Sequence, residues 1–304
     1  MDVIIPTTGK RLNQLKECIN TLKVQTLEVN IIVVLGTKFS SIKSVIKKIC
    51  EENNCTLLHE PYKKLSGSHR AVACNYGLKN TSAEFVAFVD DDVSVPPTWA
   101  ETTIKYFKDQ NVAGVTSGCR PYSSPFHLVQ TIGSDSHSRH FTETTPVESL
   151  PGYNSIYRRK VLELVGGFSE DIGGCEDWEL NYRIRKVGWK LCGIPETPVE
   201  HRHSYTWRSF VRQMFGYGWS RSRLLRKKHI FTLKHALPTI YFLSLPLFVL
   251  NKDLLFTVGV YIAFLSFLTL YVGARSIEGF FKIILTFIVM HISWGLGYLK
   301  GLIS

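Results

Sequence analysis

The sequence contains no CxxC pair, and its seven cysteines are an odd number spread between Cys18 and Cys192. Zinc motifs and disulfide frameworks depend on regular cysteine spacing, so the cysteines are interpreted as buried thiols in a reducing compartment. No basic region precedes the apolar run that starts at Val3, and we therefore expect no signal peptide. With 45% hydrophobic residues and only 22 glycines in 304 residues, the chain is neither disordered nor collagen-like.

Acidic residues are missing from one stretch of the chain. Residues 201–235 contain nine Lys and Arg and no Asp or Glu, whereas residues 1–200 contain 23 residues of each sign. The net charge of +11 is therefore concentrated in one band, which adjoins apolar segments, and this excludes a nucleic-acid-binding surface. Trp207, Phe210 and Met214 recur at helical spacing beside Arg208 and Arg212. Residues 206–235 are thus predicted to form a basic amphipathic segment at a membrane surface, with a solvated helix face as the alternative.

Long apolar segments follow this band. Residues 254–272 carry no charge and are long enough to cross about 30 Å of hydrocarbon. Residues 280–299 are interrupted only by Lys282 and His291, and residues 236–250 are shorter and contain two prolines. We predict two or three transmembrane helices in residues 236–304, against the alternative of a buried helical domain. The basic residues before the first segment, and Arg275 between the last two, place these loops and the preceding domain on the cytoplasmic side of the cell membrane.

The first 200 residues alternate between short β-branched runs and amphipathic stretches. Residues 3–6, 31–35 and 85–89 are continuous apolar runs whose length suits strands buried on both faces, as in a parallel sheet. Helical periodicity over residues 10–24 and again over residues 42–49 predicts crossover helices between them. The strand–helix–strand order predicts an open α/β sheet, and such sheets bind ligands beyond the carboxyl ends of their strands.

Three adjacent carboxylates, Asp90, Asp91 and Asp92, come directly after the third apolar run. They repel one another unless a cation neutralises them, and hard oxygen ligands of this kind suit Mg²⁺ or Mn²⁺. A helix cap or a solvated acidic turn is the alternative interpretation.

A second acidic pair, Glu176 and Asp177, precedes an amphipathic stretch, and His201 follows a Pro-containing segment. The carboxylates either begin a helix and interact with its dipole, or take a proton from an attacking hydroxyl. His201 is either an ordinary structural histidine or a group that completes a metal or diphosphate site.

Three blocks of the chain, in this order and at this spacing, resemble the family 2 glycosyltransferases: VIIPTTGKRLNQLKECINTLKVQT, SHRAVACNYGLKNTSAEFVAFVDDDVSVPPTW and GYNSIYRRKVLELVGGFSEDIGGCEDWELNYRIRKVGWKLCGIPETPVEH. The resemblance covers about residues 2–225. It implies a GT-A fold, a Rossmann-like open sheet that binds nucleotide-diphospho-sugars, over residues 1–205. It also implies a UDP- or GDP-linked sugar donor, a divalent metal (Mg²⁺ or Mn²⁺) and inversion at the anomeric carbon.

The resemblance also implies roles for individual residues. Asp90 and Asp92 match the outer acids of the family's DxD motif, and His201 matches a histidine near the metal or diphosphate. Asp177 matches the catalytic base, and Glu176 precedes it on the acceptor side. The expected metal ligands are therefore Asp92, Asp90 and His201, and the expected donor contacts are Pro6, Thr7, Arg70, Asn75, Asp90 and Asp91.

Two departures from the family pattern concern the donor. The family often carries an acid after its second strand, in a loop that contacts the base, but this chain has VVLGTK with Gly36. The family's ARN segment reads Ala73-Cys74-Asn75, and Arg70, one helical turn earlier, can supply a comparable charge.

The resemblance, together with the apolar segments, therefore implies an inverting, metal-dependent and membrane-anchored glycosyltransferase that acts on a lipid-linked or cell-surface glycan precursor at the cytoplasmic membrane face. One alternative is a polyprenyl-phosphate sugar synthase, whose acceptor is the lipid phosphate itself. An alternative of another class is a non-catalytic membrane protein that retains the fold.

Overall fold

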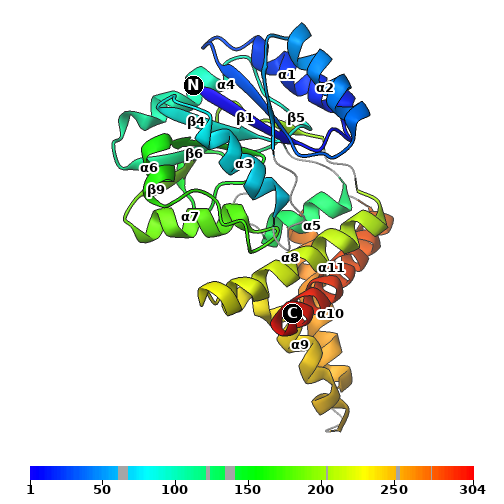
Figure 1. The fold of residues 1–304 in the computed structure, drawn as a ribbon. Helices are drawn as coiled ribbons and strands as arrows, with labels where there is room; N and C mark the ends of the chain where they lie inside the picture. The colour runs from blue at the N-terminus through cyan, green and yellow to red at the C-terminus, as the bar shows by residue number, and fades with distance from the viewer. Residues whose placement is uncertain (61–67, 121–123, 134–140, 203–204, 251–253, 275) are drawn as a thin grey trace. The chain divides into compact units, whose positions relative to one another are not determined.

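The computed structural model describes residues 1–60, 68–120, 124–133, 141–202, 205–250, 254–274 and 276–304. The chain forms two compact units (Figure 1). The first unit comprises Met1–Pro121 and Ser134–His203, and the second comprises Tyr122–Gly133 and Ser204–Ser304. The basic segment thus belongs to the same unit as the apolar helices that follow it.

An eight-stranded sheet forms the centre of the first unit, with strand order β3-β2-β1-β4-β8-β6-β9-β7. Its strands are β1 (Asp2–Thr7), β2 (Asn30–Leu35), β3 (Thr56–His59), β4 (Phe85–Val89), β6 (Val112–Thr116), β7 (Thr145–Pro146), β8 (Asn154–Arg158) and β9 (Lys190–Gly193). A separate two-stranded sheet pairs β5 (Val93–Ser94) with β10 (Glu200–His201).

The three strands predicted from apolar runs are β1, β2 and β4. They are parallel neighbours, with Ile4 opposite both Ile32 and Phe88. The sheet is nevertheless mixed, because β8 runs antiparallel to both β4 and β6. The parallel arrangement predicted for the three apolar strands and the open α/β architecture are both confirmed, and the antiparallel β8 is a feature that the apolar runs did not reveal.

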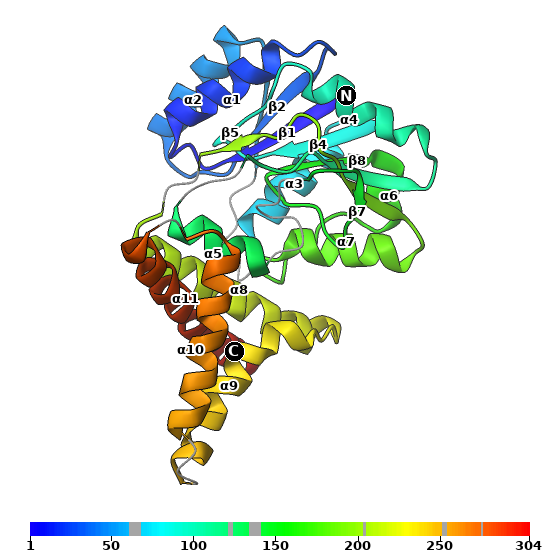
Figure 2. The same ribbon diagram turned by 180° about the vertical axis from the view of Figure 1, so that it is seen from behind.

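Helices cover both faces of the sheet (Figures 1 and 2). On one face lie α1 (Leu12–Lys23), α2 (Ser40–Glu52) and α4 (Trp99–Lys105), which the short 3₁₀ helix η1 (Tyr106–Lys108) follows. The opposite face carries α3 (His69–Lys79), α6 (Arg159–Leu164) and α7 (Glu176–Lys186). Ile4 and Phe88 from the sheet, Cys74 from α3 and Leu180 from α7 share the buried core on this second face. Burial on both faces leaves the carboxyl edge of the sheet as the place for a ligand.

In its described residues, the second unit contains helices and no strands. It contains α5 (Pro125–Gly133), α8 (Trp207–Lys228), α9 (Leu233–Leu250), α10 (Leu254–Tyr271) and α11 (Ile277–Ile303). The basic segment forms α8, which begins with a capping box between Thr206 and Ser209. Helix α8 therefore has a defined start, as its sequence periodicity predicts.

Glycines allow α8 and α11 to approach closely. A Cβ atom added to Gly218 would lie 2.0 Å from the Trp294 carbonyl oxygen, and one added to Gly297 would lie 2.0 Å from the Phe215 carbonyl oxygen. Gly301 lies one helical turn beyond Gly297 and packs against α8 in the same way. Small residues four positions apart are a common way for membrane helices to bring their backbones together.

Within the described residues, one helix, α11, is long and apolar enough to span a membrane. The apolar part of α10, Leu255–Tyr271, is shorter. Both helices leave large apolar side chains exposed, among them Leu255, Phe256, Phe267, Phe281 and Leu296. Of the two or three spanning helices predicted, the length and composition of the described helices support one, α11.

Candidate functional site

The acidic triplet directly follows β4 at the carboxyl edge of the sheet, and each carboxylate has different partners. The Thr7 hydroxyl, at the end of β1, donates to Asp91 Oδ2 at 2.6 Å. Arg70 on α3 donates from Nε to Asp90 Oδ1 at 3.0 Å. Asp92 is paired with Arg11, whose guanidinium also lies 3.5 Å from Asp91 Oδ1. Cationic side chains therefore offset much of the repulsion among the three acids.

The pairing of β5 with β10 brings His201 to this triplet. His201 lies opposite Val93, the residue that follows Asp92. Its Nε2 is 3.2 Å from Asp92 Oδ1, and its ring stacks on Tyr153 with ring centroids 4.3 Å apart. Asp90, Asp92 and His201 each offer one ligand atom, and these atoms lie within 4.8 Å of one another. The structure thus brings the three predicted metal ligands together.

The surroundings set the ionisation of this cluster. Burial lowers the pKa of His201 to about 4, so its imidazole is neutral at pH 7, which is the form in which histidine binds metal ions. Burial alone would raise the pKa of Asp90, but the charge of the Arg70 guanidinium and its hydrogen bond hold that pKa below the ordinary value. Burial raises the pKa of Asp91, which is the one acid of the triplet outside the ligand cluster.

Glu176 and Asp177 form the first residues of α7, and Arg70 connects them to the triplet. Arg70 Nη1 lies 3.8 Å from Glu176 Oε1, and Nη2 donates to the Gly152 carbonyl oxygen. The Gly152 amide in turn donates to Asp177 Oδ2 at 3.0 Å. Burial, followed by the charge of Asp177, raises the pKa of Glu176. Arg70 therefore stands between the two acidic groups that the sequence identifies, although 86 residues separate Asp90 from Glu176.

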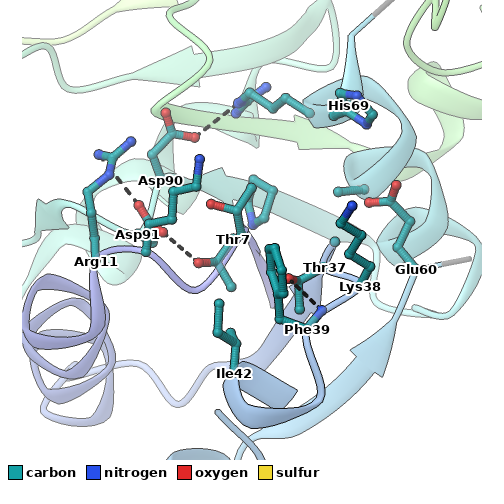
Figure 3. A pocket seen from close by; sticks show the side chains of 16 residues that line it. Thr7, Arg11, Thr37, Lys38, Phe39, Ile42, Glu60, His69, Asp90 and Asp91 are labelled. Carbon is teal, nitrogen blue, oxygen red and sulfur yellow. Dashed lines mark hydrogen bonds and ion pairs between the residues drawn. The ribbon is translucent and has the colours of Figure 1, made fainter. Parts of the chain in front are cut away.

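A cavity of about 430 Å³ opens beside the triplet (Figure 3). It is lined by the ends of β1 to β4 and the start of α3, including the predicted donor contacts Pro6, Thr7, Arg70, Asp90 and Asp91. Further lining side chains include Arg11, Lys38, Phe39, Ile42 and His69. The combination of cationic, carboxylate and apolar groups suits a ligand with a charged end and a ring system.

Asn75 does not line this cavity. Its side-chain amide donates to the Phe168 carbonyl oxygen at 2.9 Å and to Glu170 Oε1 at 2.9 Å, and its oxygen accepts from the Phe168 amide at 2.8 Å. In this structure Asn75 therefore connects α3 to the loop after α6. The predicted contact between Asn75 and the donor stays a prediction, because Asn75 lies outside the cavity.

Glu60, at the end of β3, is a lining residue that the sequence analysis did not single out. A Cβ atom added to Gly36 would lie 2.9 Å from Glu60 Oε2, so the glycine leaves space for this carboxylate. The sequence signal was an acid directly after a short β-branched and leucine run, TLLH, at the same edge of the sheet.

Comparisons with known proteins identify related sequences and folds. The model of "Glycosyl transferase family 2" matches residues 2–166, and that of "Glycosyl transferase family group 2" matches residues 85–298. The pre-mycofactocin glycosyltransferase of Mycobacterium tuberculosis is 27% identical over 175 residues, covering 55% of this chain and 36% of that protein. The O-antigen chain rhamnosyltransferase WbaN of Salmonella anatum is 30% identical over 152 residues, covering 45% of this chain and 46% of that protein.

The chain thus aligns with between about a third and a half of the length of these two relatives. Among solved structures, the mannosyltransferase PcManGT from Pyrobaculum calidifontis, in complex with GDP-Man and Mn²⁺, is similar with a TM-score of 0.66 and 17% identity. That similarity covers 99% of this chain and 86% of the mannosyltransferase, so the likeness of fold includes the C-terminal helices.

Proposed function

Because the chain belongs to glycosyltransferase family 2 and has its GT-A fold, we propose that it transfers a sugar from a nucleotide-diphospho-sugar to a lipid-linked or cell-surface glycan acceptor, with inversion at the anomeric carbon. One observation carries the proposal. Arg70 contacts both Asp90, in the candidate metal cluster, and Glu176, beside the candidate base. A diphosphate bound at the cluster would therefore lie next to a carboxylate able to activate an acceptor hydroxyl.

The candidate metal cluster suits a divalent cation. Two carboxylates and a neutral imidazole with ligand atoms within 4.8 Å of one another can share one ion, and we propose that Asp90, Asp92 and His201 hold Mg²⁺ or Mn²⁺. PcManGT, which has a similar fold, is described with GDP-Man and Mn²⁺. Such an ion supplies positive charge that stabilises a diphosphate leaving group.

The protein's own groups would hold the rest of the donor. Arg11 and Arg70 place guanidinium groups at the triplet, where they can form charge-assisted hydrogen bonds with diphosphate oxygens. Pro6 and Thr7, at the end of β1, line the same cavity. In this arrangement Asp91 is held by the Thr7 hydroxyl and orients the loop around the donor.

Asp177 is the proposed general base, and Glu176 is proposed to lie on the acceptor side. Two backbone amides, those of Gly152 and Trp178, donate to the two Asp177 oxygens and hold the carboxylate in place. Asp177 would accept the proton of the acceptor hydroxyl as this oxygen attacks the sugar face opposite the leaving diphosphate. A single displacement of this kind inverts the anomeric carbon.

The second unit is proposed to hold the protein in the cell membrane, with α8 lying at the cytoplasmic interface. The length of α11 and the exposed apolar side chains of α10 and α11 support this, and α8 carries a basic last turn, Arg226, Lys227 and Lys228. The test is fractionation: the full chain should stay in the membrane pellet after alkaline carbonate washing, and its release into the supernatant would contradict membrane insertion.

The catalytic proposal is tested with Asp177→Asn. A general base typically contributes about 10²–10⁴-fold to the rate, so transfer should fall at least about 100-fold while donor affinity stays near that of wild type. Since the new amide group must face one of two backbone N–H donors, folding is checked by the melting temperature.

Asp109→Asn is the matched control. Asp109 also accepts a hydrogen bond from a backbone amide, that of Asn111, but it lies outside the site. It should retain full transfer. Near-normal transfer by Asp177→Asn, with the donor bound, would remove Asp177 from the mechanism.

A further inference from the structure

Glu60 occupies the end of the cavity away from the acidic triplet. It follows β3, whereas Asp90 follows β4, and the strand order places β2 and β1 between them. Three strand spacings correspond to roughly 14 Å, which is comparable to the length of a nucleoside diphosphate. Figure 3 shows Glu60 on the opposite side of the cavity from Asp90 and Asp91.

The Glu60 side chain is largely buried but lines the cavity, where its carboxylate can bind a ligand. Glu60 is only 6% exposed, and no side chain in the described part of the chain forms an ion pair or a hydrogen bond with its carboxylate. Its backbone is fixed by a hydrogen bond from the Glu60 amide to the Leu35 carbonyl oxygen. Gly36, the next residue of that neighbouring segment, leaves the space beside Oε2 open.

Holding an acid in this position is unfavourable for the protein alone. Burial, together with the negative charge of Glu170, raises the pKa of Glu60 to about 7. A buried polar group without a hydrogen-bond partner costs free energy that a bound ligand can recover. The geometry therefore points to a ligand that brings hydrogen-bond donors to this end of the cavity.

Guanine has the edge that fits an ionised carboxylate. Its N1–H and N2–H₂ groups are adjacent donors, and they can reach two carboxylate oxygens at once. Uracil offers a single N–H between two carbonyl oxygens and so gives a carboxylate one hydrogen bond instead of two, and adenine and cytosine place a ring acceptor at that edge. Phe39, which is 56% exposed, and Ile42 supply ring and aliphatic surface in the same part of the cavity for the flat base.

We propose that Glu60 binds the Watson–Crick edge of guanine and that the sugar donor is a GDP-sugar. The proposal rests on the proposed function, because it assumes that the charged end of the nucleotide lies at the acidic triplet. Glu60 then takes the place of the acid that is missing after β2, where Gly36 stands. In this arrangement an acid that follows β3, instead of β2, forms the hydrogen bonds that distinguish the base.

The test measures binding of three nucleotides to the full-length, detergent-solubilised protein with Mn²⁺ by calorimetry. GDP should bind at least about tenfold more tightly than UDP and than IDP, which lacks only the N2 amino group of guanine. In Glu60→Gln, GDP affinity should fall by at least about tenfold and the difference between GDP and IDP should largely disappear.

Glu170→Gln is the matched control. Glu170 contributes negative charge near Glu60 but does not line the cavity, and its variant should keep the preference for GDP over IDP. Tighter binding of UDP than of GDP, or equal binding of GDP and IDP by the wild-type protein, would overturn the guanine assignment while leaving the transferase proposal intact. Failure to bind any nucleoside diphosphate, with UDP, ADP and CDP included, would overturn both. Because the comparison of GDP, IDP and UDP uses the wild-type chain, it decides the matter even if Glu60→Gln does not fold.

Discussion

The close crossing of α8 and α11 makes a quantitative prediction about two glycines on the same helix. Gly216 and Gly218 are both helical, but a Cβ atom on Gly216 would meet nothing within 4 Å, whereas one on Gly218 would lie 2.0 Å from the Trp294 carbonyl oxygen. Ordinary Cβ contacts begin at 3.4 Å. The Gly218→Ala variant must therefore move the two helices apart by about 1.4 Å at that point, since a backbone oxygen cannot rotate away as a side chain can.

The magnitudes follow from two effects. Replacing a helical glycine by alanine stabilises the helix by roughly 0.5–1 kcal/mol, and this gain applies equally to both positions. Forcing extra volume into a close-packed contact typically costs about 1–3 kcal/mol, and this cost applies only to Gly218. The helix effect cancels in the comparison, so Gly218→Ala should be less stable than Gly216→Ala by about 1–3 kcal/mol.

The assay is thermal unfolding of the full chain in detergent, followed by the fluorescence of its six tryptophans. One kcal/mol shifts the melting temperature by about 2–4 °C in chains of 150–250 residues, so a separation of several degrees is expected here. Gly297→Ala, whose Cβ would meet the Phe215 carbonyl oxygen at 2.0 Å, should behave like Gly218→Ala. Equal melting temperatures for the Gly216 and Gly218 variants would refute the close helix crossing.

Two further predictions concern the candidate site. In Asp92→Asn, nucleotide binding should no longer depend on added Mn²⁺, and the melting temperature should stay within a few degrees of wild type. Calorimetry that shows an unchanged Mn²⁺-dependent affinity would contradict the metal assignment. The pKa of Glu60 is raised from 4.5 to about 7, so the folded state holds this proton over a pH range in which the unfolded state releases it. Wild-type stability should therefore fall as the pH rises from about 4.5 to about 7, by up to about 3 kcal/mol. Glu60→Gln should be more stable than wild type above pH 7 and equal to it below pH 4.5, as urea unfolding in nucleotide-free buffer would measure.

The first half of the sheet was predictable because its strands are apolar on both faces. The apolar run at residues 85–89 corresponds to β4, Phe85–Val89, residue for residue. Strand β8, Asn154–Arg158, gives no such signal, since its sequence NSIYR is largely polar. Its polar side chains are buried because residues distant in the sequence satisfy their hydrogen bonds. For example, Arg158 Nε donates to the Val112 carbonyl oxygen. Such partners are distant in the sequence, so periodicity does not reveal them.

The candidate site was predictable where acids are adjacent in the sequence and not where geometry alone brings groups together. The triplet and the Glu176–Asp177 pair were identified from the residues, whereas the position of Glu60 depends on β3 being the next strand beyond β2 and on Gly36 having no side chain. The predicted substitute for the family's ARN arginine, Arg70, does reach Asp90. Asn75 matches the asparagine of the family's ARN segment, but its hydrogen bonds with the Phe168 backbone hold its side chain against a loop and away from the cavity.

The pairing of β5 with β10 has a consequence for any shortened form of the protein. His201 belongs to a strand of two residues, and the first unit ends two residues later, at His203. A chain cut after Glu200 would lose one of the three proposed metal ligands, which is also one of the two residues of β10. A chain cut after His203 would keep the ligand on a free end, and free ends fray. Comparison of its Mn²⁺ affinity with that of the full chain would show whether His201 needs the continuing chain after β10 to stay in place as a ligand.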